Sequence, residues 1–341
     1  MNELIINSTD FEIKNFNQGV ASFDPIFDSV IIWTRFDIGS NVTINWEVAS
    51  DESFNELIRT GSVPVTSEFD YTINIDVAEL PSNSKFYYRF YEEETKSISV
   101  VGETITLPSE TDAIENVSFA VASCSNFAAG LFNVYDAIAN SNADVVLHLG
   151  DYIYEYEVGN FGTNANGINT AALGREHEPT NEIVSLNDYR GRYKQYRGDK
   201  SLQLAHQKKP FIAVWDDHEV TNDAFSSGAE NHQASEGSFE VRKQIAIQVY
   251  SEYMPVRTSD PSLIYRAFNF GNLVSLHMLD TRIIGRDQQL AFENFFTETG
   301  DFDFVSFSTE LANPDRRMLG DTQLSWLSNS LNNSSTWQVL G

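Results

Sequence analysis

The feature that most constrains the fold is a set of four short apolar runs separated by long intervening segments. The runs are residues 117–124, 144–149, 210–215 and 273–279. Continuous apolar runs of this length are typical of strands that are buried on both faces. A helical pattern between the first two runs requires a right-handed crossover and therefore parallel pairing. The sequence thus predicts an α/β sheet in the second part of the chain.

Apolar residues at helical spacing indicate the helices that connect these strands. The clearest helix covers residues 239–253, with one predicted apolar stripe and Pro255 as a stop signal. The stripe consists of Val241, Ile245, Val249 and Tyr253. Near the end of the chain, Leu324, Leu327 and Leu331 predict another helix, and residues 337–340 predict a further strand.

The first part of the chain has a different period. Between residues 20 and 106, short alternating runs are separated by turn residues, as an antiparallel sandwich requires. A chain of 341 residues is also long for one core. We therefore expect an all-β immunoglobulin-like or fibronectin III-like domain over residues 1–110, a linker over residues 107–112, and an α/β domain over residues 111–341.

Composition limits the function. The formal net charge is −27, which repels polyanions and argues against a nucleic-acid-binding surface. If the substrate is nevertheless anionic, bound cations are an economical source of local positive charge. The single cysteine, Cys124, excludes an internal disulfide framework. No apolar run reaches the roughly 20 residues of a membrane helix, and no signal peptide is visible.

Side chains that can bind metals follow the predicted strands. In open α/β sheets, ligands bind beyond the carboxyl ends of the strands, where the loops converge. Thiol, carboxylate, phenol, imidazole and guanidinium groups lie at these ends, at Cys124, Asp151, Tyr154, Asp216, Asp217, His218, Asp280 and Arg282. For Asp216, direct metal ligation and a supporting position are both open. A salt bridge explains Asp280 and Arg282 equally well.

The motifs at these ends resemble the alkaline phosphatase D (PhoD-like) family of the metallophosphoesterase superfamily. The similarity rests on SCSN (123–126), HLGDYIYEY (148–156), DYRGRYKQYR (188–197), WDDHEV (215–220), YMP (253–255) and MLDTR (278–282). In the first domain, SVIIWTR (29–35) and FYYRF (86–90) are also similar to the family. The resemblance implies a four-layer αββα metallophosphoesterase domain after the sandwich.

The resemblance also implies a site and a reaction. It implies ferric iron and calcium, held by Cys124, Asp151, Tyr154, Asp216 and Asp217. A phenolate near neutral pH requires a strongly polarising cation, and a carboxylate suits a hard second cation. A metal-bound hydroxide would attack phosphorus in a mono- or diester. His218 would protonate the leaving oxygen or hold a phosphate oxygen, and Arg190 and Arg192 would contact the phosphate.

The family pattern continues beyond the last residue of this chain. Relatives carry further ligands, including a GDxH-like element, after the strand that begins near Trp337, whereas this chain ends at Gly341. We therefore expect an incomplete metal site and little activity from these residues alone. The resemblance further implies a monomer that acts outside the cytoplasm on small phosphoesters. Two alternatives stay open, a non-catalytic phosphate- or glycan-binding protein and a nuclease of the same fold.

Overall fold

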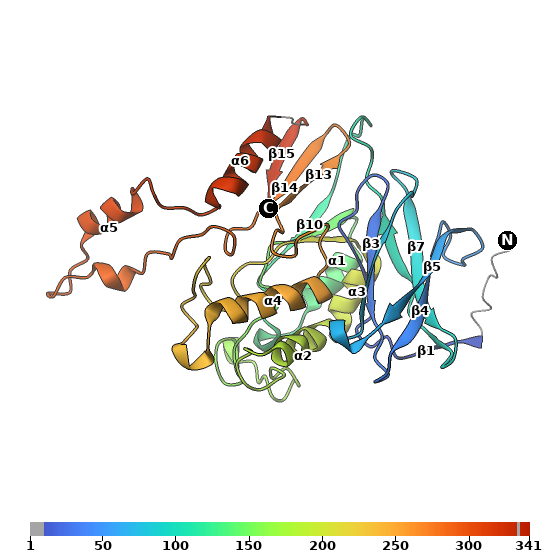
Figure 1. Cartoon of the computed structure of the whole chain (residues 1–341), viewed down its shortest axis with the longest axis horizontal. Helices are drawn as coiled ribbons and strands as arrows, with labels where there is room; N and C mark the ends of the chain where they lie inside the picture. Colours follow the sequence, from blue (N-terminus) through green and yellow to red (C-terminus); the bar gives the residue numbers. More distant parts are fainter. Residues whose placement is uncertain (1–9, 333–334) are drawn as a thin grey trace.

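The computed structural model describes residues 10–332 and 335–341. Three sheets form its framework (Figure 1). One of the two six-stranded sheets, which we call the large sheet, runs in the order β10 (Phe119–Ala122), β11 (Val145–His148), β12 (Phe211–Ala213), β2 (Val20–Phe23), β3 (Val30–Arg35) and β6 (Thr72–Val77). Strands β10, β11 and β12 pair in parallel, which confirms the α/β prediction.

A second sheet packs against the N-terminal part of the first. Its strands are β1 (Glu12–Ile13), β4 (Val42–Ala49), β5 (Leu57–Val65), β7 (Lys85–Glu92), β8 (Ser97–Ile98) and β9 (Gly102–Ile105). The two layers enclose a core that includes Val30, Ile32, Val48 and Phe90. The N-terminal region is therefore built as two packed layers of strands.

The N-terminal region is not a separate all-β sandwich, and here the structure corrects the sequence-based expectation. Strand β2 pairs in parallel with β12, so one layer of the sandwich continues into the α/β sheet. The reason is visible in β3, which is buried on both faces. Val30 and Ile32 belong to the sandwich core, whereas Ile31 and Trp33 belong to the α/β core. The domain boundary at residue 110 stays a proposal.

Helices cover one face of the large sheet, and a third sheet packs on the other side. The helices are α1 (Asn133–Ala139), α2 (Leu186–Arg197), α3 (Lys200–Lys208) and α4 (Phe239–Tyr253). The third sheet contains β13 (Arg266–Phe270), β14 (Val274–Met278) and β15 (Trp337–Leu340). Phe119 meets Phe270 across the two sheets at 5.0 Å between ring centroids. On the outer side of the third sheet lies α6 (Gly320–Leu331), which completes four layers (Figure 1).

Helix α4 has the predicted bounds, and most of the predicted stripe faces the core. Val249 and Tyr253 are buried and Ile245 packs against the core, whereas Val241 is 59% exposed. Arg242 is also buried and pairs with Glu182 at 2.7 Å, and this ion pair allows a charged side chain to occupy a position inside the core. Hydrophobic periodicity therefore located the helix and its buried face, except at Val241.

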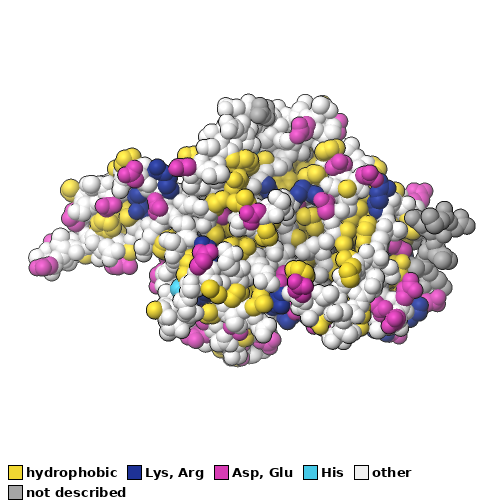
Figure 2. Space-filling model, in the orientation of Figure 1, with side chains coloured by type: hydrophobic (Ala, Val, Ile, Leu, Met, Phe, Trp, Pro, Cys, Tyr) yellow, Lys and Arg dark blue, Asp and Glu magenta, His cyan; other side chains and the backbone are white. Residues whose placement is uncertain are grey.

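The segment between β14 and α6 projects from the body of the molecule and carries α5 (Phe304–Leu311) (Figure 1). Acidic side chains are spread over the face shown in Figure 2, and basic ones occur among them, without a continuous basic stripe. None of the helices within the described residues has the length and apolarity needed to cross a membrane.

Candidate metal centre

Three adjacent loops form the candidate site at the carboxyl ends of β10, β11 and β12. Cys124 follows β10, Asp151 follows β11, and Asp217 with His218 follows β12. The first two loops are joined by hydrogen bonds from the Cys124 amide to the Gly150 carbonyl (3.2 Å) and from the Ser125 amide to the Asp151 carbonyl (2.8 Å). Parallel pairing therefore brings these residues to one edge, as predicted.

The backbone at this edge is strained. Cys124 and Asp151 have φ angles of 57° and 54°, a left-handed region that non-glycine residues rarely adopt. Between the strands, Gly150 has φ 94°, and a side chain there would meet the backbone nitrogen of Asp216. Strained residues of this kind persist where the surroundings hold them, and they gather at functional sites. The sequence pattern Gly150-Asp151 thus reflects a close approach of two loops.

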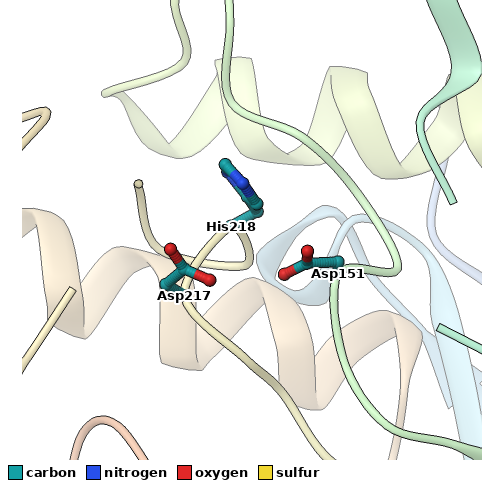
Figure 3. Close-up of side chains that lie close together, drawn as sticks. All are labelled: Asp151, Asp217 and His218. Atoms are coloured by element: carbon teal, nitrogen blue, oxygen red, sulfur yellow. The ribbon is translucent and has the colours of Figure 1, made fainter. Parts of the chain in front are cut away.

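A cluster of three ligand-type side chains lies in these loops. One ligand atom each from Asp151, Asp217 and His218 lies within 4.8 Å of the others, and all three residues are buried (Figure 3). The Oδ1 atom of Asp151 is buried and has no hydrogen-bond partner among the described residues. Burial raises the pKa of Asp217 to about 6 and also raises the pKa of Asp151. The ionised carboxylates therefore lack sufficient compensation from protein groups.

Two further predicted ligands lie beside Asp151. The phenol of Tyr154 donates a hydrogen bond to Asp151 Oδ2 at 3.0 Å. Burial, followed by the charges of Asp151 and Cys124, raises the pKa of Tyr154. Burial and the Asp151 charge also raise the pKa of the Cys124 thiol. Phenol, thiol and carboxylate thus meet in one place, and each would need a cation beside it to ionise near neutral pH.

A buried glutamate connects two of the loops that form the site. Glu219 accepts hydrogen bonds from the backbone amides of Asp151 (3.1 Å), Tyr152 (2.6 Å) and Asp216 (2.8 Å). Burial and then the Asp151 charge raise the pKa of Glu219 to about 8. This one carboxyl group therefore ties the loop after β11 to the loop after β12.

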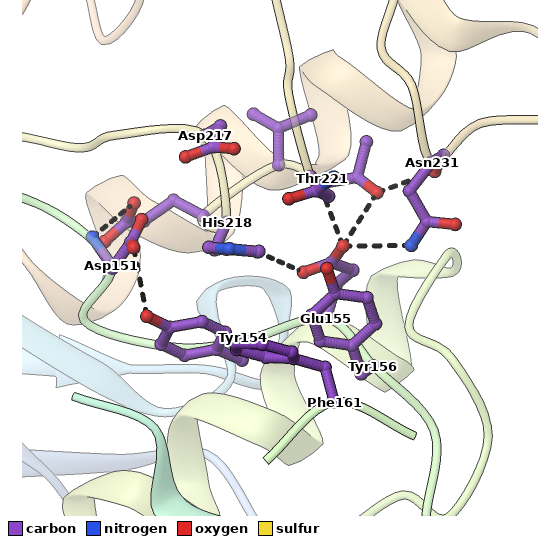
Figure 4. A network of polar contacts seen from close by, with 12 residues as sticks. Asp151, Tyr154, Glu155, Tyr156, Phe161, Asp217, His218, Thr221 and Asn231 are labelled. Atoms are coloured by element: carbon purple, nitrogen blue, oxygen red, sulfur yellow. Dashed lines mark hydrogen bonds and ion pairs between the residues drawn. The ribbon is translucent and has the colours of Figure 1, made fainter. Parts of the chain in front are cut away.

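A second buried glutamate orients His218. Glu155 accepts a hydrogen bond from His218 Nδ1 at 2.7 Å (Figure 4). It also accepts bonds from Thr221 Oγ1 (3.2 Å), Asn222 N (2.7 Å) and Asn231 Nδ2 (2.9 Å). Burial opposes the charged imidazole, but the bond to Glu155 and the charges of Glu155, Asp217 and Asp151 together outweigh it, and the pKa of His218 rises to about 9. We call His218, Glu155, Thr221 and Asn231 the imidazole network.

The sequence analysis did not identify Glu155, Thr221 or Asn231. A signal for Glu155 was present in the sequence, because it is a charged residue between Tyr154 and Tyr156 in a stretch rich in tyrosines. Asn231 lies in an irregular loop that no motif marks. Its contribution depends on how that loop returns to the site.

The predicted ligand Asp216 lies next to the cluster and forms an ion pair. Arg282 binds its carboxylate through Nε (2.6 Å) and through the NH2 nitrogen (3.2 Å). The same guanidinium lies 3.3 Å from Asp217 and 3.7 Å from Asp223. Its NH1 nitrogen is buried and makes no hydrogen bond within the described residues. Arg282 is therefore a cationic group at the site itself.

The structure corrects the expectation that Arg190 and Arg192 contact phosphate. Both lie on α2 and are buried. Arg190 pairs with Glu252 at 2.6 Å. Arg192 donates to the carbonyls of the loops around the site, those of Tyr154, Tyr156, Glu178, Pro179 and Asn181. Both guanidinium groups therefore bind other groups of the protein. Those of Arg192 include the Tyr154 carbonyl, so Arg192 supports the loop that carries Tyr154.

The donor set fits metal binding. Carboxylate oxygens suit hard cations, whereas a thiol and a phenol suit a transition metal such as iron. An unpartnered buried carboxylate oxygen and carboxyl groups with raised pKa values are the features that a cation would compensate. The residues present therefore fit a metal centre, with Asp151 between the thiol and phenol on one side and Asp217 and His218 on the other.

Comparison with known proteins identifies the family to which the chain is similar. The model of the family described as PhoD-like phosphatase matches residues 119–341, and that of the PhoD-like phosphatase N-terminal domain matches residues 4–108. The chain is 36% identical over 346 residues to alkaline phosphatase D of Bacillus subtilis (strain 168). That match covers 97% of this chain but 56% of the relative, so the chain spans little more than half of the relative's length.

Solved structures agree. A structure of PhoD superposes with a TM-score of 0.82 at 34% identity and covers 97% of this chain and 62% of the PhoD chain. A purple acid phosphatase from seeds of yellow lupin (Lupinus luteus) has a TM-score of 0.51 at 14% identity, covering 88% of this chain and 49% of the other. The second likeness shows the fold alone.

Proposed function

This chain belongs to the PhoD-like phosphatase family, and from that premise we propose that it hydrolyses phosphoric esters at the candidate metal centre. The observation that supports this most directly is the convergence of Asp151, Asp217 and His218 within 4.8 Å at the carboxyl edge of the sheet. The family assignment gives the reaction class, and the cluster gives it a location.

In this proposal, Cys124, Tyr154 and Asp151 would hold a ferric ion, and Asp217 would hold a calcium ion. When bound, such ions neutralise negative charge on the phosphoryl group and make water a stronger nucleophile. The protein's part is to hold the donors in place through the strained backbone at Cys124 and Asp151 and through Glu219. Asp216 is given a different role, because its carboxylate positions Arg282.

His218 supplies the proton in the proposed reaction. A water molecule forms a new bond to phosphorus and releases one proton to solvent, while the bond from phosphorus to the leaving oxygen breaks. The leaving oxygen takes up a proton from Nε2 of His218, which regains one from solvent after the product has left. Glu155 binds Nδ1 and therefore directs Nε2 toward the substrate. We assign the phosphate contact to Arg282, because its guanidinium lies 3.3 Å from Asp217 of the cluster and can pair with phosphate oxygens. Arg282 thereby takes the role first expected of Arg190 and Arg192.

The proposed substrate is a small phosphoester rather than a nucleic-acid polymer. A net charge of −27 opposes the approach of a polyanion, whereas one phosphate can be neutralised locally by cations and Arg282. We also propose, from the family resemblance, that the protein acts outside the cytoplasm and as a monomer.

The test is hydrolysis of bis-p-nitrophenyl phosphate after loading with iron and calcium. We compare the full-length gene product with its variants Asp151→Asn and Asp217→Asn and with the exposed control Asp315→Asn. The site variants should lose at least about a hundredfold in activity, since each removes a donor from the metal centre. Elemental analysis should show less bound metal in the site variants and no change in the control.

Three results would contradict the proposal. Equal metal content in all four proteins would mean that the cluster is not the metal centre. Metal and phosphate binding without release of nitrophenol would favour the non-catalytic phosphate-binding alternative. Hydrolysis that depends on metal but survives Asp217→Asn would place the reaction elsewhere.

A further inference from the structure

An exposed aromatic ring lies next to the candidate metal centre. Phe161 is 59% exposed, and its ring packs on Tyr154 (centroids 6.2 Å apart, planes at 24°) and on Tyr156 (5.5 Å) (Figure 4). Both tyrosines also contact His218, with centroid distances of 4.2 Å and 5.5 Å. We call Tyr154, Tyr156 and Phe161 the aromatic wall. It begins at a predicted metal ligand and ends in solvent.

The loop that carries Phe161 is anchored beside the site. Gly162 packs so closely on Asn126 that a side chain there would meet the Asn126 amide. Asn164 and Thr170 exchange hydrogen bonds of 2.7 and 3.1 Å, and Thr170 Oγ1 donates to the Ala128 carbonyl at 3.0 Å. Asn126 and Ala128 belong to the segment that follows Cys124. The ring is therefore held in position by both neighbouring loops.

The position of the wall coincides with the place of the leaving group. In the proposed hydrolysis, the leaving oxygen takes its proton from His218, so the group attached to that oxygen must lie close to the imidazole. The two rings that flank this imidazole are Tyr154 and Tyr156, and Phe161 extends them outward. Aromatic faces favour planar partners in offset or edge arrangements.

We propose that the aromatic wall is a subsite for the leaving group and that it selects phosphoesters of planar unsaturated groups, such as aryl or nucleobase-bearing esters, over esters of polyols. This inference rests on the proposed function. Single exposed apolar residues are common on protein surfaces and need no explanation. Phe161 differs because it is anchored, packs on two rings and continues a surface that contains the proposed acid. The neutral wall also suits an uncharged planar group in an otherwise acidic protein.

The test compares two monoesters, p-nitrophenyl phosphate and glycerol 3-phosphate, in the metal-loaded full chain. Phe161→Ala should lower kcat/KM for the aryl ester about three- to tenfold, the range expected for a lost ring contact. The same variant should change hydrolysis of the glycerol ester by less than about twofold. Phe161→Trp should restore the preference for the aryl ester. Phe27→Ala removes a half-exposed phenylalanine of the N-terminal region and serves as the matched control.

Binding of non-hydrolysable probes separates this inference from the proposed function. Phenylphosphonate should bind the metal-loaded protein about three- to tenfold more tightly than methylphosphonate, and Phe161→Ala should remove the difference. Equal affinities, or an equal loss of activity toward both esters in Phe161→Ala, would overturn the subsite and leave the proposed function standing. Failure to bind either probe or to hydrolyse either ester would overturn the proposed function and the subsite with it.

Discussion

The two sides of His218 are built in opposite ways. On one side, the imidazole network is buried, and the carboxylate of Glu155 accepts hydrogen bonds from His218, Thr221, Asn222 and Asn231. On the other side, the aromatic wall makes few polar contacts and reaches solvent at Phe161. A proton donor requires a fixed orientation and a fixed pKa, whereas a substrate requires access. In the proposed function, these two needs fall to different faces of the same imidazole.

The contrast also appears in the electrostatics. Glu155 has a pKa below its ordinary value, because the bonds from His218, Asn231 and Asn222 outweigh its burial. Tyr154 has a raised pKa, because burial and the charges of Asp151 and Cys124 favour the neutral phenol. Protein groups alone therefore stabilise the charged carboxylate of Glu155 in the imidazole network. In the aromatic wall, an ionised Tyr154 would need an added cation.

The largest effect should come from removing the phenol of the aromatic wall. Tyr154→Phe keeps the ring that packs on His218 and Phe161 but removes a proposed ligand. We expect metal affinity to fall by about a hundredfold, with loss of the visible absorption that a phenolate-to-iron bond produces. Isothermal titration with iron and a visible spectrum of the loaded protein measure both changes.

Tyr156→Phe is the matched control for this substitution. It removes a phenol from the same wall, one residue beyond Glu155, and we do not place that phenol in the metal centre. Its affinity for iron and its spectrum should match those of the unmodified chain. If Tyr154→Phe also keeps the iron affinity and the spectrum of the unmodified chain, Tyr154 is not a ligand.

The next effect concerns the imidazole network. Glu155→Gln removes the negative charge that raises the pKa of His218 and places an amide beside Nδ1. We expect kcat to fall about 10- to 100-fold, the range seen when a partner that orients a reacting group is lost. The exposed Glu52→Gln is the control. An unchanged kcat in Glu155→Gln would remove His218 from the proposed role.

The pH dependence of the metal-free protein isolates the same contact. Because the folded pKa of His218 is raised to about 9, protonated His218 stabilises the fold fully below its unfolded pKa of roughly 6.5. This contribution is lost as the pH rises through about 9. In Glu155→Gln the pKa should fall, as NMR titration of the imidazole in chelator-treated protein would show. A pKa that stays near 9 would mean that Asp217 and Asp151 raise it instead.

Much of this arrangement could be predicted from the sequence. Strand ends in an α/β sheet carry ligands to a common edge, so Cys124, Asp151, Tyr154, Asp217 and His218 were identifiable from the apolar runs before them. Helix α4 was predicted with its correct bounds. These predictions succeed because each depends on a local pattern and one general rule of topology.

The missed elements depend on contacts between distant segments. Strand β3 was predicted, but its pairing with β6 and the pairing of β2 with β12 were not. These pairings depend on which face of β3 packs against each of the two cores. Arg190 and Arg192 carry the charge that a phosphate contact requires, yet internal partners bury them on α2. A strand-end salt bridge was considered for Asp280 and Arg282, but the guanidinium of Arg282 pairs with Asp216, and Asp280 accepts from the backbone amide of Arg282 instead. Charge alone could not show which arginine faces the site.

The smallest expected effect is at the edge of the imidazole network. Asn231→Ala removes one donor to Glu155 (2.9 Å) and leaves the bonds from Thr221 and Asn222. One such bond contributes about 1 kcal/mol, and its effect reaches the substrate only through Glu155 and His218, so kcat should fall about two- to fivefold. Exposed Asn142 provides the control, Asn142→Ala. A loss as large as that of Glu155→Gln would mean that Asn231, rather than the carboxylate, determines the orientation of His218.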